Sequence, residues 1–128
     1  MPKTATELVA DARSRIRELS PVDARAELER CVLIDVREPA EFDSGHIKGA
    51  ANIPRGVLEF QVDAHPAVAN VVDASLSHKE QPVLVYCRTG GRAALAAVAL
   101  QELGFTDVRS IDGGITAWID AGLPLDAH

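Results

Sequence analysis

The sequence predicts an α/β fold in which a central, mostly parallel sheet is covered by helices on both faces. Short runs of apolar, β-branched residues alternate with segments whose apolar residues recur at helical spacing, and glycine or proline separates most of these segments. Continuous apolar runs are typical of parallel strands, which are buried on both faces and joined by helical crossovers. With 128 residues, 47% of them hydrophobic, the chain has the size and apolar content of one compact domain.

The first predicted element is an amphipathic helix from Ala5 to Leu19. Its apolar residues fall at spacings of four, four and three, which places them on one helical face: Leu8, Ala12, Ile16 and Leu19. We predict that residues 1–19 form this N-terminal helix and that residues 20–128 form the main domain. The apolar face needs cover, which either the same chain or a second copy in a dimer can supply.

The next part of the chain is predicted to hold two helices around one strand. Ser20 is a good helix cap, and Pro21 suits the first helical position. The apolar run that follows this helix predicts a strand ending at Asp35. The predicted ranges are 22–30 for the first helix, 31–34 for the strand and 39–43 for the second helix. Residues 55–76 are apolar and compatible with a helix whose limits the sequence does not define.

The clearest unit surrounds Cys87. A buried strand leads into a tight turn, an alanine-rich helix follows, and Gly104 closes that helix. A further strand and a last helix complete the α/β pattern. The predicted ranges are 83–86 (strand), 87–91 (turn), 92–103 (helix), 106–111 (strand) and 115–120 (helix).

The position of Cys87 predicts a reactive thiol. Ligands of open α/β sheets bind outside the carboxyl ends of the strands, where Cys87 lies. The helix N-terminus that follows it, together with Arg88 and Arg92, favours a thiolate over a thiol. Gly90 and Gly91 allow the loop to turn its amides inward around one atom. A cysteine after a buried strand is otherwise often an inert core residue, but this loop composition favours the reactive interpretation.

Composition excludes several other classes of function. The net charge of −6 argues against a nucleic-acid partner, because such proteins usually carry a basic face. The two cysteines, Cys31 and Cys87, form no Cys-x-x-Cys pair, so neither a zinc site nor a disulfide framework is indicated. Cys31 enters an apolar strand and is expected to be a core or peripheral thiol. With no apolar span and no signal peptide, a cytoplasmic location without membrane contact is expected.

The chain resembles single-domain rhodaneses, the sulfurtransferase family. The matching segments occur in the family's order from about Ser20 to Pro124. They are Asp35-Val36-Arg37-Glu38-Pro39-Ala40-Glu41-Phe42, Gly45-His46-Ile47-Lys48-Gly49-Ala50-Ala51-Asn52-Ile53-Pro54, the loop Cys87–Arg92, Gly104-Phe105, and Gly113-Gly114 with Trp118. The resemblance implies a rhodanese-like three-layer fold and sulfur transfer without a metal or organic cofactor.

The resemblance also implies roles for individual residues. Cys87 would accept the sulfur, and the amides of Arg88, Thr89, Gly90, Gly91 and Arg92 would surround its persulfide and bind substrate. Arg92 would hold the loop by hydrogen bonds, and Arg88 would face the anionic substrate. The implied partners are a small anionic donor such as thiosulfate and an acceptor such as cyanide, a thiol or a carrier protein.

Three further side chains of the matching segments lie outside the loop. Asp35 ends a strand at the same sheet edge as Cys87, where it either orients loop groups or Arg37, or caps a turn or a helix. We expect His46 to be a hydrogen-bonded structural residue rather than a general base, and Trp118 to be a packing residue.

Two rival functions use the same residues. Related phosphatases and arsenate reductases also place a cysteine in an anion-binding loop, with five residues between Cys and Arg, whereas four separate Cys87 from Arg92. The shorter loop should fit a single sulfur better than a tetrahedral oxyanion. Non-catalytic rhodanese modules are the second rival, but such copies typically lack the cysteine that this chain keeps.

Overall fold

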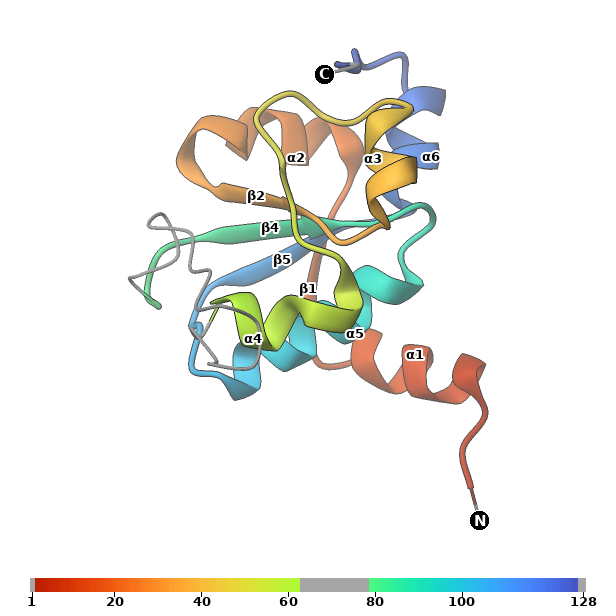
Figure 1. The fold of residues 1–128 in the computed structure, drawn as a ribbon, viewed down its shortest axis with the longest axis vertical. Helices are drawn as coiled ribbons and strands as arrows, with labels where there is room; N and C mark the ends of the chain where they lie inside the picture. The colour runs from red at the N-terminus through yellow and green to blue at the C-terminus, as the bar shows by residue number, and fades with distance from the viewer. Residues whose placement is uncertain (1, 63–78, 127–128) are drawn as a thin grey trace.

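The computed structural model describes residues 2–62 and 79–126 and confirms the α/β class (Figure 1). Its sheet has five strands in the order β1-β5-β4-β2-β3, and every pair of neighbours is parallel. The strands are β1 (Arg17–Leu19), β2 (Val32–Asp35), β3 (Ala51–Asn52), β4 (Val83–Tyr86) and β5 (Val108–Ile111). The buried runs of β2 and β4 pair in the middle of the sheet, as their apolar sequences require.

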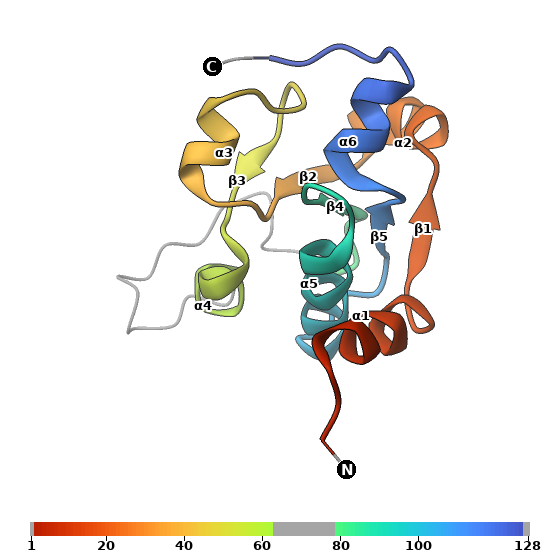
Figure 2. The same ribbon diagram turned by 90° about the vertical axis from the view of Figure 1, so that its right-hand side faces the viewer.

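Helices cover both faces of this sheet, which gives the three layers predicted (Figures 1 and 2). One layer holds α1 (Ala5–Arg13), α4 (Leu58–Val62) and α5 (Gly91–Glu102). The other holds α2 (Pro21–Glu27), α3 (Pro39–Asp43) and α6 (Gly114–Asp120). Two 3-10 turns, η1 (Leu28–Arg30) and η2 (Arg55–Val57), continue α2 and precede α4. Successive side chains along β4 and at Cys87 point to opposite faces of the sheet, so they contribute to two separate parts of the core. Val83, Val85 and Cys87 pack on the α5 side, and Leu84 and Tyr86 pack on the α6 side.

The prediction of one helix from Ala5 to Leu19 is wrong beyond Arg13. Residues 17–19 form the edge strand β1, which pairs with β5. Ile16 lies in the turn before β1 and Leu19 lies in β1, and each is partly buried against one of the two core clusters. Their burial therefore produces a helical spacing in the sequence although neither residue is in a helix. The predicted division between an N-terminal helix (residues 1–19) and the main domain (residues 20–128) therefore falls at the end of β1, a strand of the same five-stranded sheet.

The same chain covers part of the apolar face of helix α1, while Leu8 on that face stays 46% exposed. Ala12 is buried, and the Gln101 side-chain amide donates a hydrogen bond of 3.2 Å to the Arg15 carbonyl. Arg15 also lies 3.8 Å from the Glu102 carboxylate on α5. Helix α1 therefore packs on α5 of the same chain, and cover of its remaining apolar surface by a second copy stays a prediction.

Most other predicted elements are confirmed. The helix 39–43 and the strand 83–86 have the predicted limits, and the Ser20 hydroxyl accepts a hydrogen bond from the Asp23 amide, as a helix cap does. The two-residue strand β3 was not predicted, because it is too short to show a periodic pattern. Residues 63–76 of the helix-compatible stretch lie outside the described residues. None of the helices in the described ranges is long and apolar enough to cross a bilayer.

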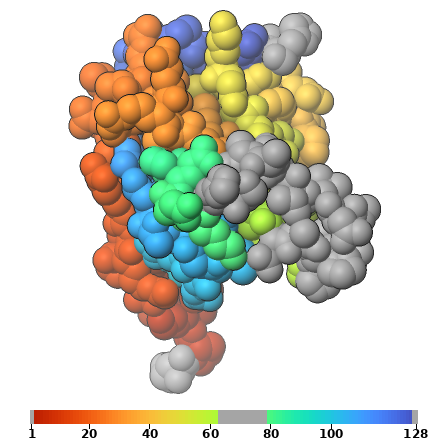
Figure 3. Space-filling view, turned by 90° about the vertical axis from the view of Figure 1, so that its left-hand side faces the viewer, coloured from red at the N-terminus to blue at the C-terminus, as the bar shows by residue number. Residues whose placement is uncertain are grey.

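The two ends of the parallel sheet differ in what they carry. Figure 3 shows the face at the amino ends of the strands, where the segments leading into β2 (orange), β4 (green) and β5 (blue) come together. Cys31 lies at this end, immediately before β2. Cys87 lies at the opposite end, directly after β4, so the sheet separates the two thiols.

Candidate active site

The Cys87 loop turns backbone amides toward the sulfur. Cys87 Sγ accepts hydrogen bonds from the Gly90 amide at 3.1 Å and the Ala93 amide at 3.4 Å. Gly90 caps α5 with φ of 121°, a conformation that side chains rarely adopt. The sulfur thus sits at the N-terminus of a 12-residue helix, where N–H groups and the helix dipole stabilise negative charge.

The donors differ in part from the predicted set. Gly90 belongs to the five amides expected around the sulfur, whereas Ala93 lies one residue beyond them. The arrangement around a persulfide stays a prediction. Only 1% of Cys87 is exposed, so a sulfur donor must pass the residues packed around the loop before it reaches the Cys87 sulfur.

The first turn of helix α6 donates hydrogen bonds to backbone carbonyl groups of the Cys87 loop. The Ile115 amide donates to the Cys87 carbonyl at 2.9 Å, and the Thr116 amide donates to the Arg88 carbonyl at 3.1 Å. Gly114 allows this close approach, since a Cβ atom there would lie 2.5 Å from the Cys87 carbonyl oxygen. Sequence reasoning noted the Gly113-Gly114 pair as a family match but missed its contact with the loop.

Arg92 pairs with Glu41 of α3, a residue that sequence reasoning did not place in the site. Two guanidinium nitrogens of Arg92 donate to the two carboxylate oxygens of Glu41 at 2.7 and 3.0 Å. This bidentate pair raises the pKa of Arg92 and lowers the pKa of Glu41 to about 2. Arg92 was expected to hold the loop by hydrogen bonds, but in the described chain its side chain bonds Glu41 and so ties the start of α5 to α3.

Asp35 and Arg37 form a buried ion pair beside the site. The Arg37 guanidinium donates to both Asp35 carboxylate oxygens, the shortest bond being 2.7 Å, and also to the Gly45 carbonyl at 2.7 Å. The Arg37 amide adds a bond of 2.9 Å to the same carboxylate. The structure shows both roles considered for Asp35: its carboxylate orients the Arg37 guanidinium and also caps the turn at the Arg37 amide.

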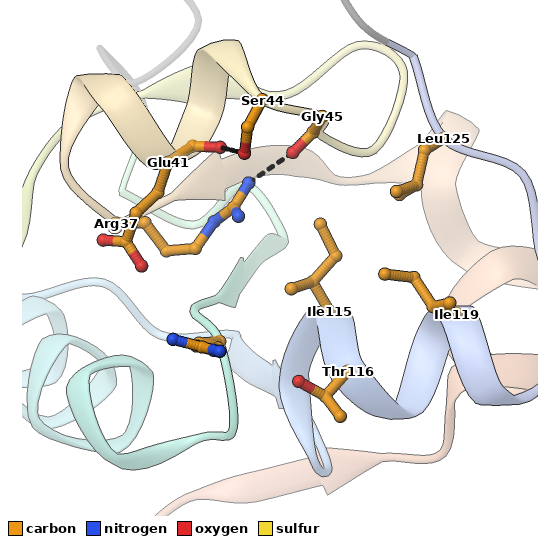
Figure 4. Close-up of a pocket in the computed structure, with 9 residues that line it drawn as sticks. Arg37, Glu41, Ser44, Gly45, Ile115, Thr116, Ile119 and Leu125 are labelled. Carbon is orange, nitrogen blue, oxygen red and sulfur yellow. Dashed lines mark hydrogen bonds between the residues drawn. The ribbon is translucent and has the colours of Figure 1, made fainter.

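A cavity of about 420 Å³ lies between the Cys87 loop, α3 and α6 (Figure 4). We call it the loop cavity. It is lined by Arg37, Glu41, Ser44, Gly45, Arg88, Ile115, Thr116, Ile119 and Leu125. The Arg88 guanidinium makes no hydrogen bond or ion pair with any described residue, so its charge is available to a ligand. Thr89 is exposed and does not line the loop cavity, and its substrate contact stays a prediction.

The other side chains singled out in the sequence have structural surroundings. His46 is buried, stacks on Phe42 at 3.8 Å between ring centroids and shares a hydrogen bond of 3.0 Å with the Phe42 carbonyl. Trp118 is buried and donates to the Pro124 carbonyl at 2.9 Å. Burial raises the pKa of the Cys31 thiol, which is consistent with a peripheral unreactive cysteine. Within residues 2–62 and 79–126, no cluster of three His, Cys, Asp or Glu could hold a metal.

Comparison with known proteins decides the family. A model of the rhodanese-like domain matches residues 20–121. The chain belongs to the rhodanese family. The match begins after α1 and β1, so these two elements of this rhodanese lie outside the matched region.

Similar proteins include sulfurtransferases from distant organisms. Thiosulfate sulfurtransferase 16 of Arabidopsis thaliana is 37% identical over 97 residues, which cover 73% of this chain and 78% of that protein. A thiosulfate sulfurtransferase of Vibrio cholerae is 32% identical over 111 residues, which cover 86% and 92%. The solved polysulfide-sulfur transferase homodimer of Wolinella succinogenes is 35% identical, with a TM-score of 0.71 over 93% of this chain and 84% of that one.

One solved structure resembles this rhodanese over nearly its whole length, α1 included. It is a protein of unknown function from Rhodopseudomonas palustris, described as a possible tyrosine phosphatase. It is 32% identical, with a TM-score of 0.84 over 98% of this chain and 99% of that one. The phosphatase description makes a direct test of the two chemistries worthwhile.

Proposed function

We propose that this chain is a sulfurtransferase in which Cys87 carries the transferred sulfur as a persulfide. The observation that supports this most strongly is the loop geometry, in which Cys87 Sγ accepts two N–H bonds at the start of α5. The same donors that stabilise a thiolate can stabilise the terminal sulfur of a persulfide, because both are compact anions. The sulfurtransferases among the relatives support the same reaction class.

Thiosulfate is the donor that we propose for the first half-reaction. The Cys87 thiolate attacks the outer sulfur, a new S–S bond forms, and the bond between the two sulfurs of thiosulfate breaks. Its electron pair leaves with sulfite, so no external oxidant or reductant is needed. In the second half-reaction an acceptor thiolate or cyanide attacks the terminal sulfur and restores the Cys87 thiolate.

The test is to incubate the protein with thiosulfate and measure the intact mass. We expect one added sulfur atom in the wild type and in Cys31→Ser, and none in Cys87→Ser. Cys31 is a matched control because it is the other free thiol and lies at the opposite end of the sheet. Unmodified wild-type protein would refute the proposal.

The phosphatase alternative is tested by measuring hydrolysis of an aryl phosphate with the same three proteins. A loop with four residues between Cys87 and Arg92 forms a smaller ring than the five-residue loop of phosphatases. In addition, the Arg92 guanidinium is engaged by Glu41 rather than directed at a substrate oxyanion. We therefore expect no hydrolysis of an aryl phosphate, and steady turnover that depends on Cys87 would reverse the assignment.

A further inference from the structure

Helix α1 lies alongside α5, the helix that begins at the Cys87 loop (Figures 1 and 2). Both α1 and β1 lie outside the region that the rhodanese-like domain model matches, so membership of the family does not predict what α1 does. Two contacts of this N-terminal segment reach the backbone around the Cys87 sulfur.

The first contact is between Val9 of α1 and the start of α5. Val9 is partly buried, and its Cγ2 atom lies 3.7 Å from the position that a Cβ atom of Gly91 would occupy. The Val9 methyl group therefore lies next to the backbone of Gly91, on the side where this glycine has no side chain. Gly91 stands between Gly90 and Ala93, whose amides donate the two hydrogen bonds to Cys87 Sγ.

The second contact is between α1 and the turn that precedes α6. The Arg13 guanidinium donates to the Asp112 carboxylate at 3.1 Å, and the Asp112 amide donates to the Leu19 carbonyl at 2.8 Å. The next residue, Gly113, has its amide nitrogen 3.9 Å from the position that a Cβ atom of Gly90 would occupy. The N-terminal segment therefore holds a turn that lies beside the Cys87 loop.

Contacts with the backbone matter at this site because backbone amides bind the sulfur. The two hydrogen bonds to Cys87 Sγ are 3.1 and 3.4 Å long, and their strength depends on distance and angle. A shift of the loop backbone would weaken these bonds and so destabilise negative charge on the sulfur. Val9 opposes such a shift at Gly91, and Arg13 opposes it at the turn before α6.

We infer that α1 is a positioning element of the sulfur-transfer site, and that Val9 holds the Cys87 loop through Gly91. The inference rests on the proposed function, because it concerns how fast Cys87 takes up sulfur. Val9 does not line the loop cavity, so it acts on the loop backbone rather than on a donor bound there. Arg13 is a second positioning residue, which acts through Asp112.

The test measures the rate constant of persulfide formation with thiosulfate by following the intact mass. In Val9→Ala, which removes both methyl groups, we expect this rate constant to fall by roughly three- to tenfold. Val9→Ile should restore the wild-type rate, because isoleucine keeps the Cγ2 methyl group that lies next to Gly91. Unmodified wild-type protein would overturn the proposed function itself, whereas normal uptake by both the wild type and Val9→Ala would overturn only the role of α1.

Two controls in the same segment separate positioning from general stability. Leu8→Ala changes the neighbouring residue, which is 46% exposed, and should leave the rate constant unchanged. Ile16→Ala removes a partly buried side chain from the core on the α5 side, so it should lower the Tm without lowering the rate constant. All rates are measured well below the Tm of each variant. A fall in Ile16→Ala as large as in Val9→Ala would overturn the inference.

Arg13→Gln tests the second contact, and Lys3→Gln is its matched control. Lys3 forms an exposed ion pair with Asp11 of the same helix, which does not involve the turn before α6. We expect the rate constant in Arg13→Gln to be roughly two- to threefold lower than in Lys3→Gln. Equal rate constants in these two variants would overturn the role of Arg13.

Discussion

Replacing Gly114 with alanine should damage both the stability and the chemistry of the Cys87 loop. A Cβ atom at this position would lie 2.5 Å from the Cys87 carbonyl oxygen and 2.6 Å from that of Arg88. Both contacts are with backbone, so no side chain can rotate away to relieve them. Gly114 also has a φ of +61°, which favours glycine.

The expected cost has two parts. A left-handed backbone conformation costs a non-glycine residue about 1–2 kcal/mol. Forcing atoms into a packed region adds about 1–3 kcal/mol. Gly122→Ala isolates the first part, because Gly122 has a φ of +77° but nothing within 4 Å of the added Cβ. The free energy of unfolding should therefore fall by about 1–3 kcal/mol more in Gly114→Ala than in Gly122→Ala.

Two assays check this prediction. Urea titration or thermal denaturation gives the stability difference, and a loss of 1 kcal/mol lowers the Tm of a domain of this size by roughly 3–5 °C. The rate of persulfide formation at Cys87 should fall ~10–100-fold in Gly114→Ala, because the loop must shift, and should stay near wild type in Gly122→Ala. Equal stabilities of the two variants, or an unaltered rate in Gly114→Ala, would contradict the role of α6 in positioning the loop.

Two further predictions concern the ion pairs near the site. The pKa of Glu41 is about 2 in the folded protein against 4.5 without its partner, so its contribution to stability is complete above pH 4.5 and is lost as the pH falls towards 2. Glu41→Gln should flatten the fall in the free energy of unfolding across this window, and an unchanged pH profile would exclude the role of the Arg92 pair. Asp35→Asn leaves the Arg37 guanidinium buried without its counter-charge and should cost about 3–5 kcal/mol in urea unfolding. Asp11→Asn, which removes an exposed ion pair, should cost at most about 1 kcal/mol, and equal losses would refute the argument from burial.

Local sequence signals predicted the centre of the site well. Three local patterns surround Cys87: the apolar run before it, the glycines of the loop and the alanine-rich segment after it. Each pattern depends only on neighbouring residues, so together they predict the strand, turn and helix that the structure shows. The capped helix at Pro39–Asp43 was predictable for the same reason. In these elements neighbouring residues determine the conformation.

The features that sequence reasoning missed depend on contacts between distant residues. Glu41 and Arg92 are 51 positions apart, and no local pattern indicates their pairing. Position 114 needs a glycine because the Cys87 carbonyl oxygen lies too close for a Cβ atom. That contact is visible only once α6 is seen packed on the loop. Strand β1 is three residues long, and Leu19 fits a helical spacing as well as a strand, so its pairing with β5 decides the conformation.

The central claim, that Cys87 takes up one sulfur atom and releases the rest of the donor, is tested most directly in a single turnover with thiosulfate. Sulfite is quantified in solution while the mass of the protein is followed in the same sample. We predict one equivalent of sulfite per chain and one sulfur atom retained on the peptide that contains Cys87, in the wild type and in Cys31→Ser alike. Sulfite release without sulfur on Cys87, or the same release from Cys87→Ser, would contradict the account.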